Sequence, residues 1–321
     1  MKPSLAEDAI LDAVRFSCGT QPKIDGVRAL NLSGTLTGRS LDPFKGFGIT
    51  EYFSRPEFMG LDGEMILGDK PNCTDRLCSL TTGAMGRFKG VSEMPDLTWW
   101  VFDWVTPVST GHSYEERYAR LSAKVSALDH PRVKLVPMTI VHSREHLDRV
   151  IAHNAASGFE GTIIRNLAAP HKEGRATQAG QQLWRVKPWG DFEILVTGIT
   201  EGETNGNAAK TNSLGRTERS SAKAGMAPNG QVGSIQGTLV KDFHDPVTGK
   251  LLFAKGLSIT AGSGKMTVEE ATAYFEDPTK IVGHFAKIKT MTHGVKDLPR
   301  YPTYESHRQP EDMSWDHTNA T

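Results

Sequence analysis

The sequence has few cysteines, no long apolar run and no excess of charge of either sign. Only Cys18, Cys73 and Cys78 occur in 321 residues, a sparse and odd set that argues against a disulfide framework and favours a reducing compartment. No apolar run approaches the roughly 18 residues of a membrane-spanning helix, and the first twenty residues lack the apolar stretch of a signal peptide. We therefore expect a cytoplasmic protein that does not enter the membrane.

Size and charge set the next limits. The 37 basic and 37 acidic side chains cancel to a formal charge of zero, so any affinity for a polyanion must come from how the charges are distributed. With 38% hydrophobic and 23% charged residues over 321 positions, the chain suits one large or two medium domains with proper cores. This composition excludes general disorder.

Periodicity predicts an α+β fold. Apolar residues at helical spacing predict a short amphipathic helix over residues 4–16. Longer helices are expected at 114–128 and at 144–156, the second with Ser143 as its N-cap and Gly158 as its stop. Short segments bounded by Gly, Pro, Asn or Asp predict strands at 27–32, 35–39, 61–67, 98–105, 133–140, 161–166 and 183–187. The mixture indicates antiparallel sheets with flanking helices.

A change of composition after Trp189 predicts two domains, residues 1–189 and 190–321. Further strands are expected at 192–200, 231–241 and 251–260, which predict a small β-barrel in the second domain. A segment rich in Gly, Asn, Ser, Thr and Ala, residues 201–230, would interrupt this barrel as one long loop. A loop of that length is unusual and suggests either a function or local disorder.

The long segment is basic although the whole chain is neutral. Between 204 and 230 its charged residues are Lys210, Arg216, Arg219 and Lys223, with Glu218 as the one acid. The segment is therefore either a solvated linker or a mobile arm that orders against phosphates.

The string Lys23-Ile-Asp-Gly-Val-Arg28 is typical of a covalent nucleotide-transfer site. A lysine that attacks phosphorus needs a neutral amine, an exposing turn and a neighbouring cation. Gly26 supplies the turn and Arg28 the cation. The same letters also suit an ordinary hairpin that Asp-Gly closes, so the rest of the chain must distinguish the two.

Further strings follow in a fixed order: Gly38-Arg-Ser40, Leu61-Asp-Gly-Glu64, Val101-Phe-Asp103, Glu160-Gly-Thr-Ile-Ile-Arg165 and Leu183-Trp-Arg-Val-Lys187. With the lysine string they resemble the nucleotidyltransferase motifs of ATP-dependent polynucleotide ligases and capping enzymes. The resemblance covers essentially the whole chain. It implies an ATP-grasp-like nucleotidyltransferase domain over 1–189, the adenylation domain, followed by an OB-fold barrel over 190–321.

The resemblance also implies roles for the residues around the nucleotide. Lys23 would be the nucleophile that forms a lysyl-adenylate, Glu64 would hold the ribose hydroxyls, and Phe102 would stack on the adenine. Gln21 lies where related enzymes read the adenine edge. Attack on a phosphate also needs cations and divalent metal, and the residues suited to those needs are Asp25, Glu160 and Lys187, with Glu160 and Glu64 as ligands of Mg²⁺ or Mn²⁺.

Arginines complete the set that the resemblance implies. Arg28 and Arg39 correspond to the arginines that bind the 5′-phosphate of a nick, with Arg165 beside them. Arg185 stands where the final motif usually has a lysine, which leaves its role open. Two other positions have plainer alternatives: Phe102, among tryptophans, could be a core strand residue, and Asp62 could only close a turn.

The sequence of the second domain indicates which kind of enzyme in the family the chain resembles most. A barrel after Trp189 resembles the OB fold of DNA ligases and capping enzymes, whereas many RNA ligases have unrelated C-terminal domains. The segment 211–221 resembles the DNA-clamp loop of small phage ligases, and 298–308 resembles their terminal motif, in which Arg300 would orient the pyrophosphate. We therefore expect a monomeric ATP-dependent DNA ligase of the minimal phage or viral type that seals nicks in double-stranded DNA.

Two alternatives remain open from the sequence. An RNA ligase or a capping guanylyltransferase would share the lysine motif. A catalytically silent nucleic-acid clamp would share the domains, but it is disfavoured because the nucleophile, the carboxylates and the phosphate-binding cations are all present.

Overall fold

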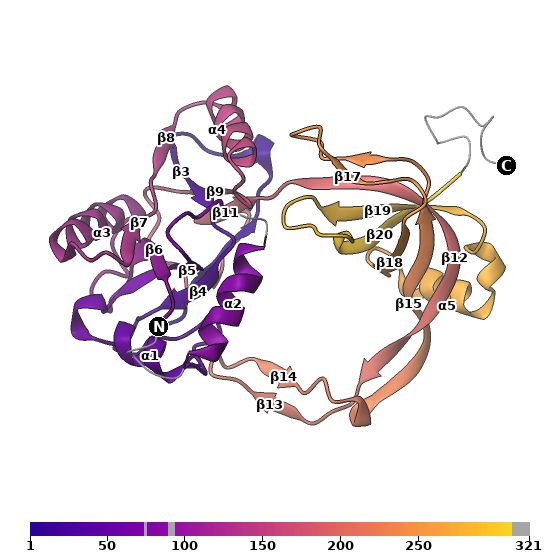
Figure 1. Cartoon of the computed structure of the whole chain (residues 1–321), viewed down its shortest axis with the longest axis horizontal. Coiled ribbons are helices and arrows are strands. Elements are labelled where there is room, and N and C mark those ends of the chain that lie inside the picture. The colour runs from indigo at the N-terminus through magenta and orange to yellow at the C-terminus, as the bar shows by residue number, and fades with distance from the viewer. Residues whose placement is uncertain (74–75, 89–93, 310–321) are drawn as a thin grey trace. The chain divides into compact units, whose positions relative to one another are not determined.

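A computed structural model describes residues 1–73, 76–88 and 94–309 of the chain (Figure 1). It contains two compact units. The first holds Met1–Lys187 together with Asn212–Arg216, and the second holds Pro188–Thr211 and the described residues from Thr217 onward. The candidate site lies in the first unit.

A five-stranded sheet in the first unit carries the lysine motif. Its strands, in spatial order, are β2 (Glu7–Asp8), β11 (Leu183–Val186), β9 (Gly161–Arg165), β3 (Cys18–Lys23) and β8 (Thr139–Val141). Strands β3 and β9 are antiparallel, and their register pairs Gln21 with Ile163 and Lys23 with Gly161. Strands that are distant in sequence thus bring Lys23 next to the Glu160-Gly161 step.

A four-stranded sheet supplies the rest of the motif residues. It contains β4 (Val27–Leu30), β5 (Leu61–Leu67), β6 (Leu97–Trp104) and β7 (Val133–Leu135) in that order. Its register pairs Arg28 with Glu64 and Glu64 with Trp100. Gly26 joins the two sheets where a Cβ atom would lie 2.6 Å from the Met65 carbonyl oxygen, so only glycine fits this connection.

Helices cover these sheets: α1 (Phe47–Phe53), α2 (Leu77–Arg87), α3 (Tyr114–Leu128) and α4 (Arg144–Ala156). The helices predicted at 114–128 and 144–156 are confirmed with the same bounds, and Ser143 caps α4 as expected. Ser113 and Glu116 form a capping box at α3. Among the described residues, no helix is long and apolar enough to cross a membrane.

Three sequence predictions for the first unit are wrong. Residues 4–16 form β1 (Ser4–Leu5), β2 and a 3₁₀ turn (Leu11–Ala13) in place of a helix, because β1 pairs with β10 (Gly174–Arg175) and β2 pairs with β11. The expected strand at 35–39 is reduced to isolated bridges of Thr37. The strand at 133–140 is broken into β7 and β8 on either side of Pro137, which has no N–H to donate.

The second unit is built on a closed barrel with the strand order β12-β15-β18-β20-β19. The strands are β12 (Trp189–Asn205), β15 (Met226–Leu239), β18 (Ser258–Gly262), β19 (Phe285–Met291) and β20 (Arg300–Arg308). Helix α5 (Val268–Glu276) lies between β18 and β19 in sequence, and β16 (Phe243–His244) pairs with β17 (Leu251–Phe253). The barrel core contains Phe192, Ile194, Ile235, Ile259 and Ile288.

The predicted long loop at 201–230 is largely β-structure. Strands β12 and β15 run into it from both ends, and its middle is the hairpin of β13 (Ala209–Thr211) and β14 (Thr217–Arg219) (Figure 1). The side-chain amide of Asn205 donates to the carbonyl oxygen of Ser220 at 2.9 Å, and that of Asn207 donates to Ser220 and Ala222. These amides close the base of the hairpin, which explains why a segment of loop-like composition is ordered.

Candidate active site

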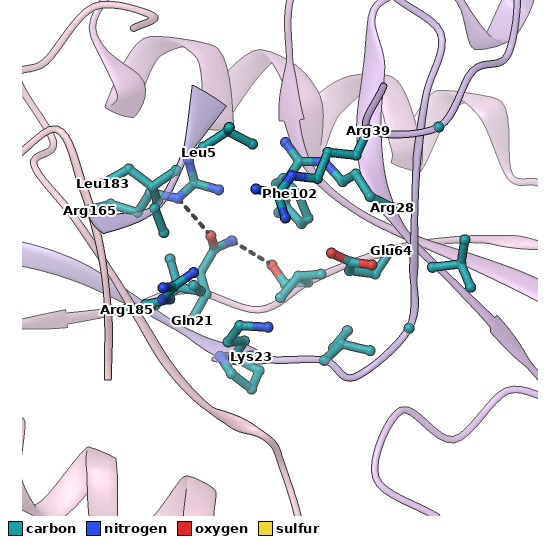
Figure 2. Close-up of a pocket in the computed structure, with 18 of the residues that line it drawn as sticks. Leu5, Gln21, Lys23, Arg28, Arg39, Glu64, Phe102, Arg165, Leu183 and Arg185 are labelled. Atoms are coloured by element: carbon teal, nitrogen blue, oxygen red, sulfur yellow. Dashed lines mark hydrogen bonds between the residues drawn. The ribbon is translucent and has the colours of Figure 1, made fainter. Parts of the chain in front are cut away.

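A cavity of about 630 Å³ in the first unit gathers half of the predicted site residues (Figure 2). Its volume is typical of a small-molecule site. The predicted residues that line it are Gln21, Lys23, Arg28, Arg39, Glu64, Phe102, Arg165 and Arg185. All but Arg39, which lies in a turn, come from the strands of the two sheets, and Gly26 connects these sheets between β3 and β4.

One carboxylate links two lysines beside the cavity, which Lys23 lines but Glu160 and Lys187 do not. Lys23 forms an ion pair with Glu160, and the Nζ atom of Lys187 lies 2.6 Å from Oε1 of the same carboxylate. Burial opposes the ionisation of Glu160, but the charges of Lys23 and Lys187 outweigh it and lower the pKa of Glu160 to about 2. Burial also lowers the pKa of Lys187. An ionised Glu160 carboxylate therefore lies between the amino groups of Lys23 and Lys187.

Arg28 is held in a fixed orientation at the cavity wall. Its Nε and Nη2 atoms donate to the two carboxylate oxygens of Asp62 at 2.6 and 2.7 Å. Its guanidinium carbon lies 4.7 Å from the centre of the Phe102 ring. Asp62 therefore does more than close a turn: it is a buried residue of β5 that orients a cation.

Within the described part of the chain, Glu64 has no bidentate partner of this kind. Burial raises its pKa to about 7. The charges of Arg28 and Lys23 oppose the rise, while the carboxylates of Glu160 and Asp62 add to it. Glu64 is therefore a cavity-lining carboxyl group that titrates near neutral pH, whereas Glu160, which does not line the cavity, stays ionised.

Two further arginines face the cavity. Nε of Arg185 donates to Asp8 at 2.7 Å, which ties the variant position of the last motif to strand β2. The pKa of Arg39 is lowered mainly because burial disfavours its charged form. The positive charges of Arg175 and Arg28 lower it further. The positive potential that this implies suits an anionic ligand such as a phosphate.

Phe102, Gln21 and Arg165 belong to a buried network that the motifs only partly indicated. Nε of Arg165 donates to Oε1 of Gln21 at 3.2 Å, and the hydroxyl of Tyr114 lies 3.0 Å from the same oxygen. Asp103 receives two hydrogen bonds from Arg117. The motifs do not predict the role of Tyr114, because the first residue of an amphipathic helix resembles an ordinary core position. The sequence signal for this buried network is Asp103, a charged residue within a strand of aromatic residues.

Some predicted residues lie outside the cavity. Asp25 is buried in the connection between β3 and β4 and does not line the cavity. Arg300 begins β20 in the second unit. The cations Lys210, Arg216, Arg219 and Lys223 are exposed on or beside the β13–β14 hairpin. Their roles are not fixed by the geometry of the cavity.

The described residues contain no cluster of three or more His, Cys, Asp or Glu side chains that could hold a metal ion. Glu64 and Glu160 are the two predicted ligands, and their charges repel each other. A divalent cation between such carboxylates would relieve that repulsion, so the donor set is compatible with Mg²⁺ when substrate phosphate supplies further oxygens.

No protein-family model and no curated protein matches the sequence. Among solved structures, the chain is similar to a Lig E DNA ligase with 19% identity and a TM-score of 0.65, over 96% of this chain and 99% of that one. A Chlorella virus DNA ligase–adenylate aligns with 22% identity over 97% and 99% of the two chains at a TM-score of 0.48. The ATP complex of the bacteriophage T7 ligase aligns with 14% identity over 96% and 98% at a TM-score of 0.44. The likeness to the Lig E structure, over nearly the full length of both chains, shows that this protein has the fold of a DNA ligase.

Proposed function

We propose that the protein is an ATP-dependent DNA ligase of the minimal viral type, which seals nicks in duplex DNA through a lysyl-AMP intermediate. The observation that supports this most directly is the surrounding of Lys23. The amine lines a cavity of nucleotide size, shares Glu160 with Lys187, and has arginines on the cavity walls. An ordinary hairpin turn, the alternative from sequence, needs none of these groups.

The first step would be the attack of the Lys23 amine on the α-phosphorus of ATP. An N–P bond forms, the P–O bond to pyrophosphate breaks, and the amine releases one proton to solvent water. Glu160, with a pKa of about 2, is too weak a base to keep that proton. Its role is to hold and orient the two amines, and Lys187 would stabilise the charge that develops on the α-phosphate.

The next two steps would use the arginines. AMP passes from Lys23 to the 5′-phosphate of the nick, and the 3′-hydroxyl then attacks that phosphate and releases AMP. Arg28, oriented by Asp62, and Arg39 are suited to bind the phosphate. Asp25 stays assigned to this site by sequence resemblance alone, whereas Arg185 also lines the cavity.

Mg²⁺ or Mn²⁺ would supply charge neutralisation at the transferred phosphate. Glu160 and Glu64 are the carboxylates that would hold it. Glu64 would also contact the ribose hydroxyls of the nucleotide. Phe102 would stack on the base, a role compatible with its place in the cavity wall.

The second unit supports the choice of duplex DNA as the acceptor. Its closed barrel has one parallel contact, between β18 and β20, and a helix between its third and fourth strands. We assign this topology to the OB fold, a common nucleic-acid-binding barrel. The domains would be 1–189 and 190–321, with the exposed basic hairpin and Arg300 contributing to DNA and pyrophosphate binding in a monomeric enzyme.

The decisive experiment is covalent labelling with α-labelled ATP, followed by joining of a nicked duplex. Lys23→Ala should abolish both, whereas Lys172→Ala, which removes an exposed lysine of the same unit, should keep both. Label retained in Lys23→Ala would refute the assignment. Labelling by GTP would indicate a capping-type enzyme, and joining of RNA in place of DNA an RNA ligase. Nick binding without any label would indicate a silent clamp.

A further inference from the structure

The orientation of the Gln21 amide is fixed by partners that each have a single hydrogen-bonding role. The Nε atom of Arg165, which can only donate, lies 3.2 Å from one amide atom, which must therefore be Oε1. The carbonyl oxygen of Val136, which can only accept, lies 3.4 Å from the other, which must be Nε2. Figure 2 shows both contacts on opposite sides of the same amide.

Buried neighbours hold Arg165 and Gln21 in this arrangement. The hydroxyl of Tyr114 lies 3.0 Å from Oε1 of Gln21 and 2.7 Å from the carbonyl oxygen of Phe102. The Arg165 guanidinium carbon lies 4.3 Å from the centre of the Tyr114 ring, and its Nη1 atom lies 3.9 Å from Asp103. All five residues except Phe102 are buried. Reversal of the amide would turn its NH₂ group toward a guanidinium that cannot accept a hydrogen bond.

The fixed amide decides what Gln21 can offer to a ligand in the cavity. One hydrogen of Nε2 is directed at Val136, and the other is available, whereas Oε1 already accepts from Nε of Arg165 and lies beside the Tyr114 hydroxyl, whose single hydrogen is shared with the Phe102 carbonyl oxygen. Gln21 therefore presents a donor. Ring atom N1 of adenine is an acceptor, while N1 of guanine carries a hydrogen and would set two donors against each other.

We propose that Tyr114 and Arg165 are positioning residues that select adenine by holding the Gln21 amide with its N–H toward N1 of the base. The proposal rests on the nucleotide site proposed above and adds residues to it. Helix α3 carries Tyr114 as its first residue, directly after the Ser113 cap. The start of that helix therefore acts on the nucleotide through Gln21 and touches no reacting atom.

The test measures self-labelling rates against concentration for ATP, GTP and 1-deaza-ATP, in which carbon replaces N1. Wild type should need about tenfold more 1-deaza-ATP than ATP for half-maximal labelling, the effect of one hydrogen bond to a fixed donor. In Arg165→Lys, which lacks the Nε donor, this ratio should fall toward one and the preference over GTP should shrink; Tyr114→Phe, which keeps the Arg165 and Val136 contacts, should lower the ratio by less. Tyr52→Phe removes a hydroxyl that bonds His130, outside the cavity, and should keep the wild-type ratios.

The ratio is measured within one sample, so a reduced folded fraction does not alter it. Lysine keeps a charge near Asp103; if Arg165→Lys nevertheless does not fold, Tyr114→Phe serves in its place, because it removes the hydroxyl beside Oε1 and keeps the Arg165 charge. Wild-type ratios in these variants, or equal use of ATP and 1-deaza-ATP by the wild type, would overturn the proposal. Absence of any labelling by wild type would instead refute the nucleotidyltransferase function on which it rests.

Discussion

Asp103 is buried and Glu64 is half-buried, and the pKa values of their carboxyl groups are shifted in opposite directions. Burial raises the pKa of both groups, but Asp103 receives two hydrogen bonds from Arg117, and these and the arginine charge lower its pKa overall. Glu64 lacks such a partner, so burial prevails and its pKa rises to about 7. At the scale of single residues, a directly bonded cation decides whether a carboxyl in this site stays ionised.

We predict that Glu64→Gln becomes more stabilising as the pH rises. A carboxyl whose pKa is raised in the folded state contributes stability below its unfolded pKa and loses it as the pH rises through the folded value of about 7. A shift of this size corresponds to at most about 3 kcal/mol, and to less here because Glu64 is only half-buried and water reaches it. Urea unfolding of both proteins at pH 5 and pH 8 checks this; a constant difference in unfolding free energy would contradict it.

We predict that Arg117→Met destabilises the first unit by about 3–5 kcal/mol, because it leaves the Asp103 carboxylate buried without its bidentate partner. The double variant Arg117→Met/Asp103→Leu should recover much of this loss, since it removes the charge as well. Unfolding free energies of the three proteins give the comparison. A single variant as stable as the wild type would show that Arg165, 3.9 Å from Asp103, is a sufficient partner.

At the scale of elements, the site depends on how closely β9 approaches β11. A Cβ atom on Gly161 would lie 2.1 Å from the carbonyl oxygen of Val186 and 3.3 Å from the Cα atom of Lys187. This contact is made by backbone and cannot yield by rotation of a side chain. Glu160 precedes the glycine and Lys187 follows β11, so the strand pair sets the distance between the two charged groups.

Gly161→Ala should therefore both destabilise the protein and impair labelling by ATP. We expect a loss of about 1–3 kcal/mol or more from the overpacked strand pair, together with a displaced Glu160–Lys187 contact. Gly86→Ala is the matched control, because no atom lies within 4 Å of its added Cβ and alanine favours the helix α2. Thermal unfolding and labelling should separate the two variants; equal melting temperatures would refute the steric argument.

At the scale of the whole molecule, the chain is neutral but the segment 204–230, which contains the β13–β14 hairpin, is net basic. A plot of the logarithm of the binding constant for a nicked duplex against the logarithm of the salt concentration has a negative slope. We predict that Arg216→Gln/Arg219→Gln makes this slope less steep by nearly 2, about 0.9 for each phosphate that an arginine no longer neutralises. The control Lys250→Gln/Lys255→Gln makes the same change in net charge at exposed positions of the second unit. Titrations between 50 and 200 mM salt, roughly the range in which such contacts matter, should distinguish the pairs. An equal slope for both variants would assign the effect to net charge alone.

Local sequence signals were sufficient for some elements and not for others. The helices at 114–128 and 144–156 were predictable because each has an amphipathic pattern and a serine cap, and strand 61–67 was predictable because Gly60 and Gly68 bound it. The first sixteen residues were mispredicted because their apolar spacing fits a helix, while the observed strands depend on partners near residues 174 and 184. Pairing over such separations leaves no local pattern.

The sequence by itself determined the chemical groups of the site: a lysine in a glycine turn, two glutamates, a cluster of arginines and an aromatic strand residue. Their identity follows from motifs that are each a few residues long. The tertiary structure alone decided which groups meet, because the pairing of β3 with β9 and β11 joins Lys23, Glu160 and Lys187. It also revealed Asp62, Asp103 and Tyr114, whose effects arise from burial and hydrogen-bond geometry, and neither quantity is encoded by spacing along the chain.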